Sequence, residues 1–584
     1  MSRNLLRVDV GTGTAQFEDL PEEFAMLGGR ALTSAIIAQE VDPLCDPLGP
    51  ENTIVFATGL LAGTTAPNSS RLSVGCKSPL TGGIKESNSG GQAANRMGRL
   101  DIAAIIVQGD PAGRKWVLNI NKDGASLVDG EPYWGLANYA CAQALHKEFG
   151  DRAACILCGP AGEFGYRNSS VALTDPEGRP SRAAGRGGSG AVMGARGLKA
   201  VVIDDAGVER PALAEPDRFK QARTTLVDGL TTHPVTGSGL PSFGTAVLIN
   251  IMNEAGGLPT RNFRFGTFDQ AEAISGETLA RNCDERGGKH EHSCMTGCVV
   301  HCSNVYVDAE GAYLSSGVEY ETIWALGANC ENADLDAIAE MDFECDDIGL
   351  DTIEMGDTLA VAMEAGVLPF GDTQGMLRLL REDVRKGTAM GHRLGNGCEH
   401  AGKEFGVTHI PTVKHQGMPA YDPRAVKGIG VTYATSPMGA DHTAGYAVAT
   451  NILDVGGHVD PLSPEGQCPL SQGLQEATAG VFDSTGLCVF LAFACLDQPE
   501  SLAAIPEMVS ARYGKEMSVN DMVAYGAKVL EMERDFNRRA GFRQVDDRLP
   551  EFFSKERLPP HNGVWDVADQ DLDKVCGWTP VTEL

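Results

Sequence analysis

The distribution of hydrophobic and polar residues along the chain changes near residue 208. Up to that point, short apolar runs bounded by turn residues, a pattern typical of strands, occupy residues 53–57, 103–108, 116–120 and 200–203. Beyond an acidic linker around 204–216, apolar residues recur at the spacing of one helical face, in residues 217–226, 335–342, 355–365 and 374–385. The pattern predicts a β-rich N-terminal region followed by a mainly helical remainder.

A second boundary is expected near residues 408–419, where Pro411 and Pro419 flank a strand-like segment. Further along, residues 519–539 have the pattern of one long helix, and Ser518 stands where a helix N-cap belongs. A chain of 584 residues is long enough for several domains. The sequence therefore predicts an α+β protein in three parts, residues 1–208, 209–411 and 412–584.

The composition excludes some classes of partner. The chain has 48 Lys and Arg residues against 78 Asp and Glu residues, a net charge of −30, which disfavours nucleic acids and anionic membranes. The first residues lack the apolar core of a secretory signal, and the most apolar run, residues 488–496, is too short to cross a bilayer. We therefore expect a cytoplasmic protein without a nucleic-acid or membrane partner.

Three of the 16 cysteines lie close together in the segment Cys294-Met-Thr-Gly-Cys298-Val-Val-His-Cys302. In a reducing compartment such a group is better explained by metal binding than by disulfides. Three local thiols and one remote thiol suit an iron–sulfur cluster, which is the favoured interpretation. The alternatives are a zinc site and unliganded thiols, and the histidines that zinc could recruit are His290, His292 and His301.

A short motif occurs twice and indicates where the remote thiol lies. The segments Asp346-Asp-Ile-Gly-Leu-Asp351 and Asp483-Ser-Thr-Gly-Leu-Cys488 share the pattern D-x-x-G-L. Glycine allows the backbone to approach a ligand closely, and carboxylates and backbone amides can bind polar ring edges. The pair therefore suggests two equivalent binding turns for one pseudo-symmetric ligand, with Cys488 as the fourth ligand of the cluster.

Several further segments, read with these motifs, resemble the tungsten-dependent aldehyde:ferredoxin oxidoreductase family along nearly the whole chain. The matching stretches begin at Asp42 (DPLCDPL), Lys77 (KSPLTG), Asn88 (NSGG), Gly159 (GPAGE), Arg182 (RAAGRGG), Gly190 (GAVMG), Glu319 (EYETIWALGAN) and Pro419 (PAYDPR). The resemblance implies an N-terminal β-sheet saddle that carries a bis-pterin tungsten or molybdenum cofactor, covered by two mostly α-helical domains. It also implies one 4Fe-4S cluster.

The resemblance further implies which residues bind these groups. Residues facing the pterins and their phosphates would be Arg71, Asn88, Gly90, Arg182, Ala183, Gly185 and Arg186. Main-chain oxygens near Asn88 and Ala183 would hold a magnesium ion that joins the phosphates. One pterin would be bound by Asp346, Leu350 and Asp351, and the other by Asp483, Leu487 and Cys488. The cluster ligands would be Cys294, Cys298, Cys302 and Cys488.

By position in the family, Glu321 and His442 would lie beside the metal. Oxidation of an aldehyde to an acid requires a general base and a donor to the carbonyl oxygen. Glu321 would accept a proton from water or from the aldehyde carbon, while His442 would hydrogen-bond to the substrate oxygen. Burial beside an anionic cofactor is expected to raise the pKa values of both groups.

The resemblance thus implies an oxidoreductase that converts a small aldehyde to a carboxylic acid and passes electrons to ferredoxin or to a small iron–sulfur subunit. A homodimer or a hetero-oligomer is the expected assembly. The alternatives are a relative that reduces aromatic thioesters or carboxylates, and a non-catalytic electron-transfer subunit.

Three positions depart from the family pattern. The cysteine spacing is C-x-x-x-C-x-x-x-C, one residue longer at its start than the family's usual spacing, so Cys283 becomes a potential substitute ligand. Met438 and Ala444 stand where arginine and lysine are common in relatives.

Overall fold

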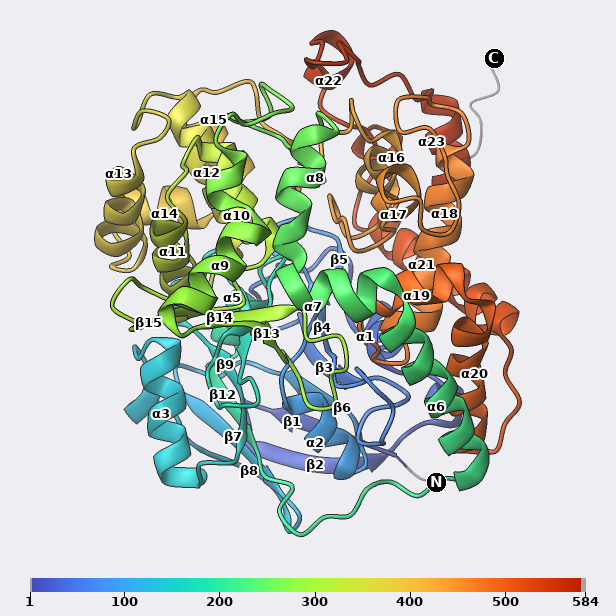
Figure 1. Ribbon diagram of the computed structural model, residues 1–584. Helices are drawn as coiled ribbons and strands as arrows, with labels where there is room; N and C mark the ends of the chain where they lie inside the picture. The colour runs from blue at the N-terminus through green and yellow to red at the C-terminus, as the bar shows by residue number, and fades with distance from the viewer. Residues whose placement is uncertain (1–2, 579–584) are drawn as a thin grey trace, which may run out of the picture.

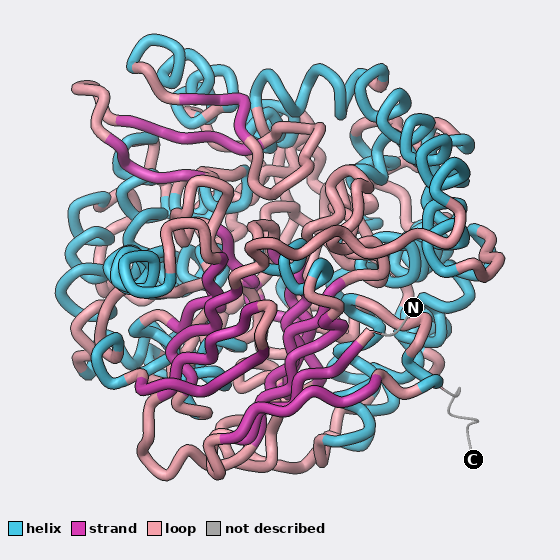
Figure 2. The backbone as a smooth tube through the Cα atoms, turned by 90° about the horizontal axis from the view of Figure 1, so that it is seen from below, coloured by secondary structure: helices cyan, strands magenta, loops and turns pink. Residues whose placement is uncertain are grey.

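The computed structural model describes residues 3–578 and has the predicted α+β fold. Two six-stranded sheets form its base (Figures 1 and 2). The first sheet has the order β2-β1-β6-β3-β4-β5 and consists of β1 (Asn4–Asp9), β2 (Thr14–Asp19), β3 (Ile54–Thr58), β4 (Leu72–Lys77), β5 (Ile84–Ser89) and β6 (Ile102–Gln108). The second has the order β8-β7-β12-β9-β10-β11 and consists of β7 (Trp116–Asn121), β8 (Gly124–Asp129), β9 (Ala154–Cys158), β10 (Val171–Leu173), β11 (Arg182–Ala184) and β12 (Leu198–Ile203).

The two sheets are copies of one topology. In each, the first strand pairs in parallel with the last strand and all other neighbours are antiparallel. The helices also correspond, because α1 (Gly29–Glu40) and α3 (Asn138–Phe149) precede β3 and β9, while α2 (Ala93–Arg99) and α5 (Ser189–Ala195) precede β6 and β12. Residues 4–108 and 116–203 are therefore two versions of the same unit.

The hydrophobic core of the base lies mainly between the sheets. Apolar side chains from both sheets meet there with those of α2 and α5, and all are almost completely buried. The opposite face of the first sheet is covered by α1, and that of the second sheet by α3. Central strands such as β6 are buried on both faces, which explains their continuous apolar runs in the sequence.

Helices and a small sheet cover the base in two groups (Figure 1). The first group contains the sheet β13 (Lys289–His292), β14 (Ser303–Val307) and β15 (Tyr313–Ser316) with helices α8 (Leu248–Glu254), α9 (Gly276–Arg286), α10 (Tyr320–Leu326), α11 (Leu335–Ile348), α12 (Thr352–Glu364), α13 (Thr373–Arg378), α14 (Ala389–Gly395) and α15 (Cys398–Phe405). The second contains α16 (Lys427–Thr435), α17 (Val448–Ile452), α18 (Gln467–Ala477), α19 (Leu491–Asp497), α20 (Pro499–Tyr513), α21 (Val519–Arg539), α22 (Phe552–Lys555) and α23 (Asp569–Cys576).

The first helix after the linker, α6 (Pro216–Thr232), lies along α20 of the second group (Figure 1). The side chain of Arg218 in α6 joins the two segments through Glu507, at 2.7 Å, and through Glu516, also at 2.7 Å. The chain therefore crosses to the C-terminal group before it enters the first group of helices.

Most elements predicted from local periodicity are confirmed. The four predicted strands correspond to β3, β6, β7 and β12, and the helical segments correspond to α6, α11, α12 and α13. The long helix α21 begins after Ser518, whose hydroxyl accepts a hydrogen bond from the Asp521 backbone N–H at 3.2 Å. Within residues 3–578 no single helix meets the length and hydropathy needed to span a membrane, and one pair, Val235–Phe243 with Thr245–Glu254, meets them only jointly across an 88° bend.

Candidate active site

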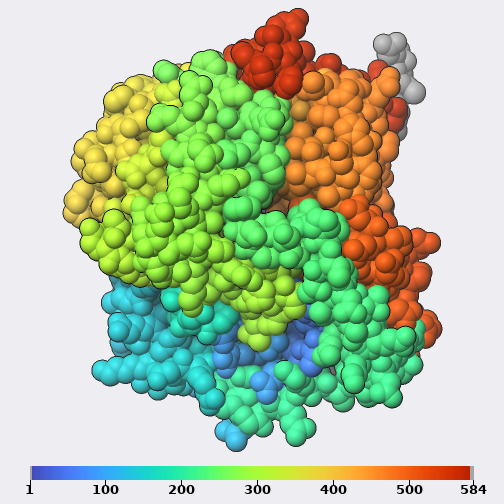
Figure 3. All heavy atoms as spheres, viewed as in Figure 1, coloured from blue at the N-terminus to red at the C-terminus, as the bar shows by residue number. Residues whose placement is uncertain are grey.

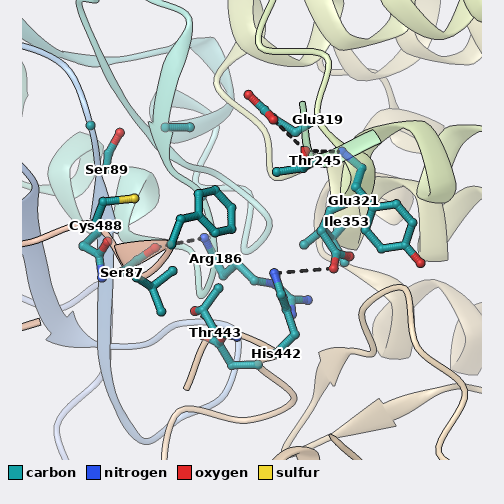
Figure 4. Close-up of a pocket in the computed structure, with 18 of the residues that line it drawn as sticks. Ser87, Ser89, Arg186, Thr245, Glu319, Glu321, Ile353, His442, Thr443 and Cys488 are labelled. Atoms are coloured by element: carbon teal, nitrogen blue, oxygen red, sulfur yellow. Dashed lines mark hydrogen bonds and ion pairs between the residues drawn. The ribbon is translucent and has the colours of Figure 1, made fainter. Parts of the chain in front are cut away.

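A cavity of about 380 Å³ lies where both copies of the β unit meet both groups of helices. Figure 4 shows part of its wall. The expected site residues that line it are Arg71, Asn88, Gly90, Arg182, Ala183, Gly185, Arg186, Cys294, Cys302, Glu321, Asp346, Leu350, Asp351, His442, Asp483 and Cys488. Two others lie outside the lining: Leu487 is buried in the adjacent core, and Cys298 is half-buried in the cysteine segment.

The surface of the molecule shows how the cavity is enclosed. In Figure 3 the two groups of helices close over the base, and the cysteine-bearing segment near residue 300 covers part of the N-terminal units. Thr296 and Gly297 are exposed on this segment, whereas Cys294 and Cys302 face the cavity. The cavity is thus partly covered, and one edge of the cysteine segment reaches the surface.

The two D-x-x-G-L turns occupy equivalent positions on the duplicated base. Gly349 (φ +86°) accepts a hydrogen bond from Ser170 N at 2.9 Å, and Gly486 (φ +78°) accepts one from Arg71 N at 3.2 Å. Each turn also packs against a glycine that follows the third strand of its unit. A Cβ atom on Gly59 would lie 2.1 Å from Gly486 N, and one on Gly159 would lie 2.2 Å from the Ile348 oxygen. Only glycine permits this approach.

Arginines from the base enter the cavity between these turns. All three side-chain nitrogens of Arg186 are used: its Nε donates to Asp351 at 3.1 Å, and its two Nη atoms donate to main-chain oxygens. Arg71 donates to both the side-chain and main-chain oxygens of Asn88. Arg182 differs, because only its Nη1 is used, in a bond of 3.0 Å to Ser303.

The remaining nitrogens of Arg182 are what an anionic cofactor would require. Its Nε and Nη2 are buried and have no hydrogen-bond partner among residues 3–578. Buried guanidinium donors cost free energy when they are left unpaired, and their fork geometry matches phosphate oxygens. The residues present therefore fit a phosphate-bearing group in this part of the cavity.

The four candidate cluster ligands converge although Cys488 is remote in sequence. The pKa of Cys294 falls to about 7 because the Cys298 thiol hydrogen-bonds to it, with Arg182 and Arg71 adding to the effect. Burial is the main cause that raises the pKa of Cys302 and Cys488, and both also sense the negative charge of a Cys294 thiolate. A thiolate is the form that binds metals, so this group suits an iron–sulfur cluster.

The zinc alternative fits the structure less well. Each histidine that zinc could recruit has one ring nitrogen engaged: His290 with Asp284 at 3.1 Å, His292 with Glu177 at 3.0 Å, and His301 with the Ser293 hydroxyl at 2.8 Å. The Nδ1 atom of His292 is buried without a partner among residues 3–578. Across residues 3–578, no three or more His, Cys, Asp and Glu side chains form a group tight enough for a single metal ion.

Cys283 does not join the other cysteines. It is buried in α9 within the core of the first helical group. Its thiol contacts the Val305 carbonyl oxygen at 3.8 Å. The longer cysteine spacing is therefore absorbed without replacing one of the four thiols.

Glu321 and His442 lie side by side in the wall of the cavity (Figure 4). Glu321 lies in the first turn of α10, where its Oε2 accepts a hydrogen bond of 3.0 Å from the Ala420 N–H. Its Oε1 lies 3.4 Å from His442 Nε2, but without hydrogen-bond geometry, so Oε1 has no partner among the described residues. His442 Nδ1 is likewise buried without a partner. Both groups are thus free to bind a substrate.

The protein's own groups shift the pKa values of this pair in opposite directions. Burial raises the pKa of Glu321 to about 8. Burial lowers the pKa of His442 to about 4, and the positive charge of Arg186 acts in the same direction against the neighbouring carboxylate of Asp441. A rise in the pKa of His442 would therefore have to come from the charge of an anionic cofactor, and it stays a prediction. At neutral pH Glu321 is mainly protonated and His442 is neutral, so their contact is not an ion pair.

Met438 and Ala444 stand where relatives commonly have arginine and lysine, but a different cation, Lys85, lies beside Met438. Met438 is buried, and its sulfur accepts a hydrogen bond from Glu86 N at 3.2 Å. The ammonium group of Lys85 donates to the Met438 oxygen at 3.2 Å and lies 3.7 Å from Asp441. Lys85, which was not predicted, therefore supplies positive charge beside the missing arginine. Ala444 lines the cavity without a polar contact of its own.

An aromatic wall extends from the candidate catalytic pair. The ring of Tyr421 lies 6.0 Å from that of His442, and the hydroxyls of Tyr421 and Tyr446 are 2.9 Å apart. Tyr446 meets Phe493 edge to face at 5.9 Å. Leu474, Leu496 and Phe490 also line the cavity. An apolar wall beside acid–base groups suits a small organic substrate.

Sequence reasoning also missed Asn68, which contacts the cysteine segment. A signal was present: Asn68-Ser-Ser70 and Asn168-Ser-Ser170 stand at the same distance after Gly59 and Gly159. This repeat marks corresponding loops in the two β units.

Comparisons with known proteins agree along the whole chain. Residues 5–205 match the family model for the aldehyde ferredoxin oxidoreductase N-terminal domain, and residues 221–580 match that for domains 2 and 3. The tungsten-containing aldehyde ferredoxin oxidoreductases of Pyrococcus horikoshii and Pyrococcus furiosus are 36% and 34% identical to the chain, each alignment covering 98% of this chain and 96% of the relative.

More distant similarities exist. A WOR-like subunit of an aliphatic sulfonate oxidoreductase from Pyrococcus furiosus is 25% identical over 73% of this chain and 72% of its own. Among solved structures, the active-site complex BamBC of benzoyl coenzyme A reductase has a TM-score of 0.81 and 20% identity, covering 99% of this chain and 95% of that chain. At this identity the likeness concerns the fold.

Proposed function

Because the chain belongs to the aldehyde ferredoxin oxidoreductase family of oxidoreductases, we propose that it oxidises small aldehydes to carboxylic acids with a bis-pterin tungsten cofactor in this cavity. The observation that carries the proposal is the half-buried pair Glu321 and His442, in which Glu321 Oε1 lies 3.4 Å from His442 Nε2. Glu321 Oε1 and His442 Nδ1 are both buried without a hydrogen-bond partner among residues 3–578. The relatives named for aldehyde oxidation are closer in sequence than those named for other substrates.

The cofactor would be held by the residues that surround the two turns. Arg182 offers its two free donors to a phosphate, and main-chain oxygens near Asn88 and Ala183 would hold the magnesium ion. Asp346, Leu350 and Asp351 would bind one pterin, with Asp483, Leu487 and Cys488 binding the other. When bound, the tungsten centre would accept the two electrons that leave the aldehyde.

The chain's own groups handle substrate and protons. The aromatic wall binds the apolar body of the aldehyde, and neutral His442 donates a hydrogen bond to its carbonyl oxygen. Conversion of an aldehyde and water to an acid releases two protons, and Glu321 Oε1 is placed to accept one when it is ionised. Its raised pKa makes Glu321 a stronger base than an exposed carboxylate.

Electrons would leave through a 4Fe-4S cluster held by Cys294, Cys298, Cys302 and Cys488, towards ferredoxin or an iron–sulfur partner subunit. If Cys488 ends a cofactor turn and also holds the cluster, the path between the two centres would be short. The exposed residues Thr296 and Gly297 mark the edge nearest the surface.

The test combines metal analysis with turnover. Protein purified anaerobically should contain tungsten and iron at a ratio of about one to four, and should reduce a viologen dye when it is given aliphatic or aromatic aldehydes. Iron without tungsten would instead indicate an electron-transfer subunit. Tungsten with thioester or carboxylate reduction, but without aldehyde oxidation, would favour the alternative substrates.

A further inference from the structure

In the loop between β3 and β4, Asn68 hydrogen-bonds both to the cysteine segment and to the second cofactor turn. Asn68 is buried and has a left-handed backbone (φ +51°), which asparagine tolerates better than most residues. Its N–H donates to the Gly297 oxygen at 2.9 Å, and its carbonyl oxygen accepts from Cys488 N at 3.0 Å. The main chain of Asn68 thus spans both ligand-bearing segments.

The side chain of Asn68 also contacts the cysteine segment. Its Oδ1 accepts a hydrogen bond from Val299 N at 3.0 Å, and its Nδ2 lies 3.4 Å from Cys298 Sγ. The Val299 N–H can only donate, so it fixes the amide with its oxygen towards Val299 and its NH₂ group towards sulfur. Ser70 on the same loop adds a bond of 3.0 Å to the Thr296 oxygen, without contacting a cysteine.

The other β unit provides an internal comparison. Asn168 stands at the corresponding position, is equally buried, and its carbonyl oxygen accepts from Asp351 N at 3.1 Å, as that of Asn68 does from Cys488. However, the Asn168 side-chain atoms have no hydrogen-bond partner among residues 3–578. The asparagine amide is therefore used only in the unit whose turn ends in cysteine.

We propose that Asn68 is a positioning residue that fixes the cysteine segment against Cys488 and raises the reduction potential of the cluster through its N–H···S bond to Cys298. The inference rests on the proposed function, because it requires the cluster. Reduction adds negative charge, which an N–H donor to a ligand sulfur stabilises, and hydrogen bonds to sulfur are among the factors that set cluster potentials. Cys298 is half-buried, as is Cys294, and it directly follows the exposed residues Thr296 and Gly297, so the bond would act on the side of the cluster nearest the surface.

The test compares the purified holoenzyme with Asn68→Gly, Asn68→Asp and the matched control Asn168→Gly. Glycine accepts the left-handed backbone but removes the amide, whereas aspartate keeps the acceptor for Val299 N and loses the donor to sulfur. Iron per chain and a redox titration followed by electron paramagnetic resonance are the two measurements. We expect iron to be retained, the midpoint potential to shift downward in Asn68→Gly and further in Asn68→Asp, and Asn168→Gly to match the unmodified protein.

Three results would overturn the inference. The first is an unchanged potential in both Asn68 variants. The second is an equal shift in Asn168→Gly, which would indicate a general loosening of the base. The third is loss of iron from Asn68→Asp, which would assign the contact a purely structural role. Unmodified protein that lacks an iron–sulfur signal would instead refute the proposed cluster, so the two failures are distinguishable.

Discussion

Replacement of Glu321 by glutamine tests the assignment of Glu321 as the base. The raised pKa of this carboxyl predicts a specific pH dependence of the reaction, and glutamine, which cannot ionise, should abolish that dependence. The pKa of Glu321 rises from 4.5 to about 8, which corresponds to about 5 kcal/mol in favour of the protonated form. The base is the ionised form, and its fraction grows from about 1% at pH 6 to about 50% at pH 8. The value of kcat/KM should therefore increase roughly 50-fold over this range, since proton transfer depends on that fraction.

The assay is anaerobic dye reduction with one aldehyde at several pH values, with tungsten and iron measured in every preparation. Glu321→Gln should retain both metals, lose about 10²- to 10⁴-fold in kcat/KM, and show a level profile. Glu319→Gln, a change in the same cavity wall, is the control and should keep the alkaline rise. An anionic cofactor would move the rise to higher pH without removing it. A level profile in the unmodified enzyme, or full turnover in fully loaded Glu321→Gln, would refute the reasoning.

Three further changes test the remaining parts of the site. Cys488→Ser should lower the iron content, whereas Cys495→Ser, a buried thiol in α19, should not; equal iron in both variants would contradict the ligand assignment. Arg182→Met should lower the tungsten content because it removes two buried donors that have no partner among residues 3–578. Arg182→Lys should also have a low tungsten content, since lysine lacks the paired N–H donors of a guanidinium group. Normal tungsten in the methionine variant would argue against phosphate binding. Arg30→Met removes the cationic partner of buried Glu533, at 2.7 Å, and should destabilise the protein by about 3–5 kcal/mol in urea unfolding. Arg30→Met with Glu533→Leu should recover part of the loss, because Asp483 still loses its contact with Arg30.

Elements with strong local signals could be predicted from the sequence. Apolar spacing located the strands and helices, and Ser518 as the expected N-cap marked the start of α21, where the structure adds a capping box with Asp521. The two D-x-x-G-L motifs were read as equivalent turns, and the fold seats them at equivalent positions on the base. Such predictions succeed because a turn glycine or an N-cap acts on its immediate neighbours.

Features that depend on distant partners could not be predicted in this way. Two strand units need only similar apolar patterns to share a fold, so the duplication left little trace beyond the repeated Asn-Ser-Ser. The lowered pKa of His442 reflects the balance among burial, Arg186 and Asp441, which no spacing reveals. Asn68 was missed because its partners at Val299 and Cys488 are far away in the chain.

The contacts that Asn68 makes with the cysteine segment and with Cys488 bear on the order in which the protein folds and takes up metal. Synthesis delivers its parts in order, first the loop after β3, then the cysteine segment, and only late in translation the turn that ends at Cys488. On the proposed assignment, a fragment that stops before Cys488 lacks one of the four ligand positions. Stable loading of the cluster would then wait until the C-terminal third has folded back onto the first strands.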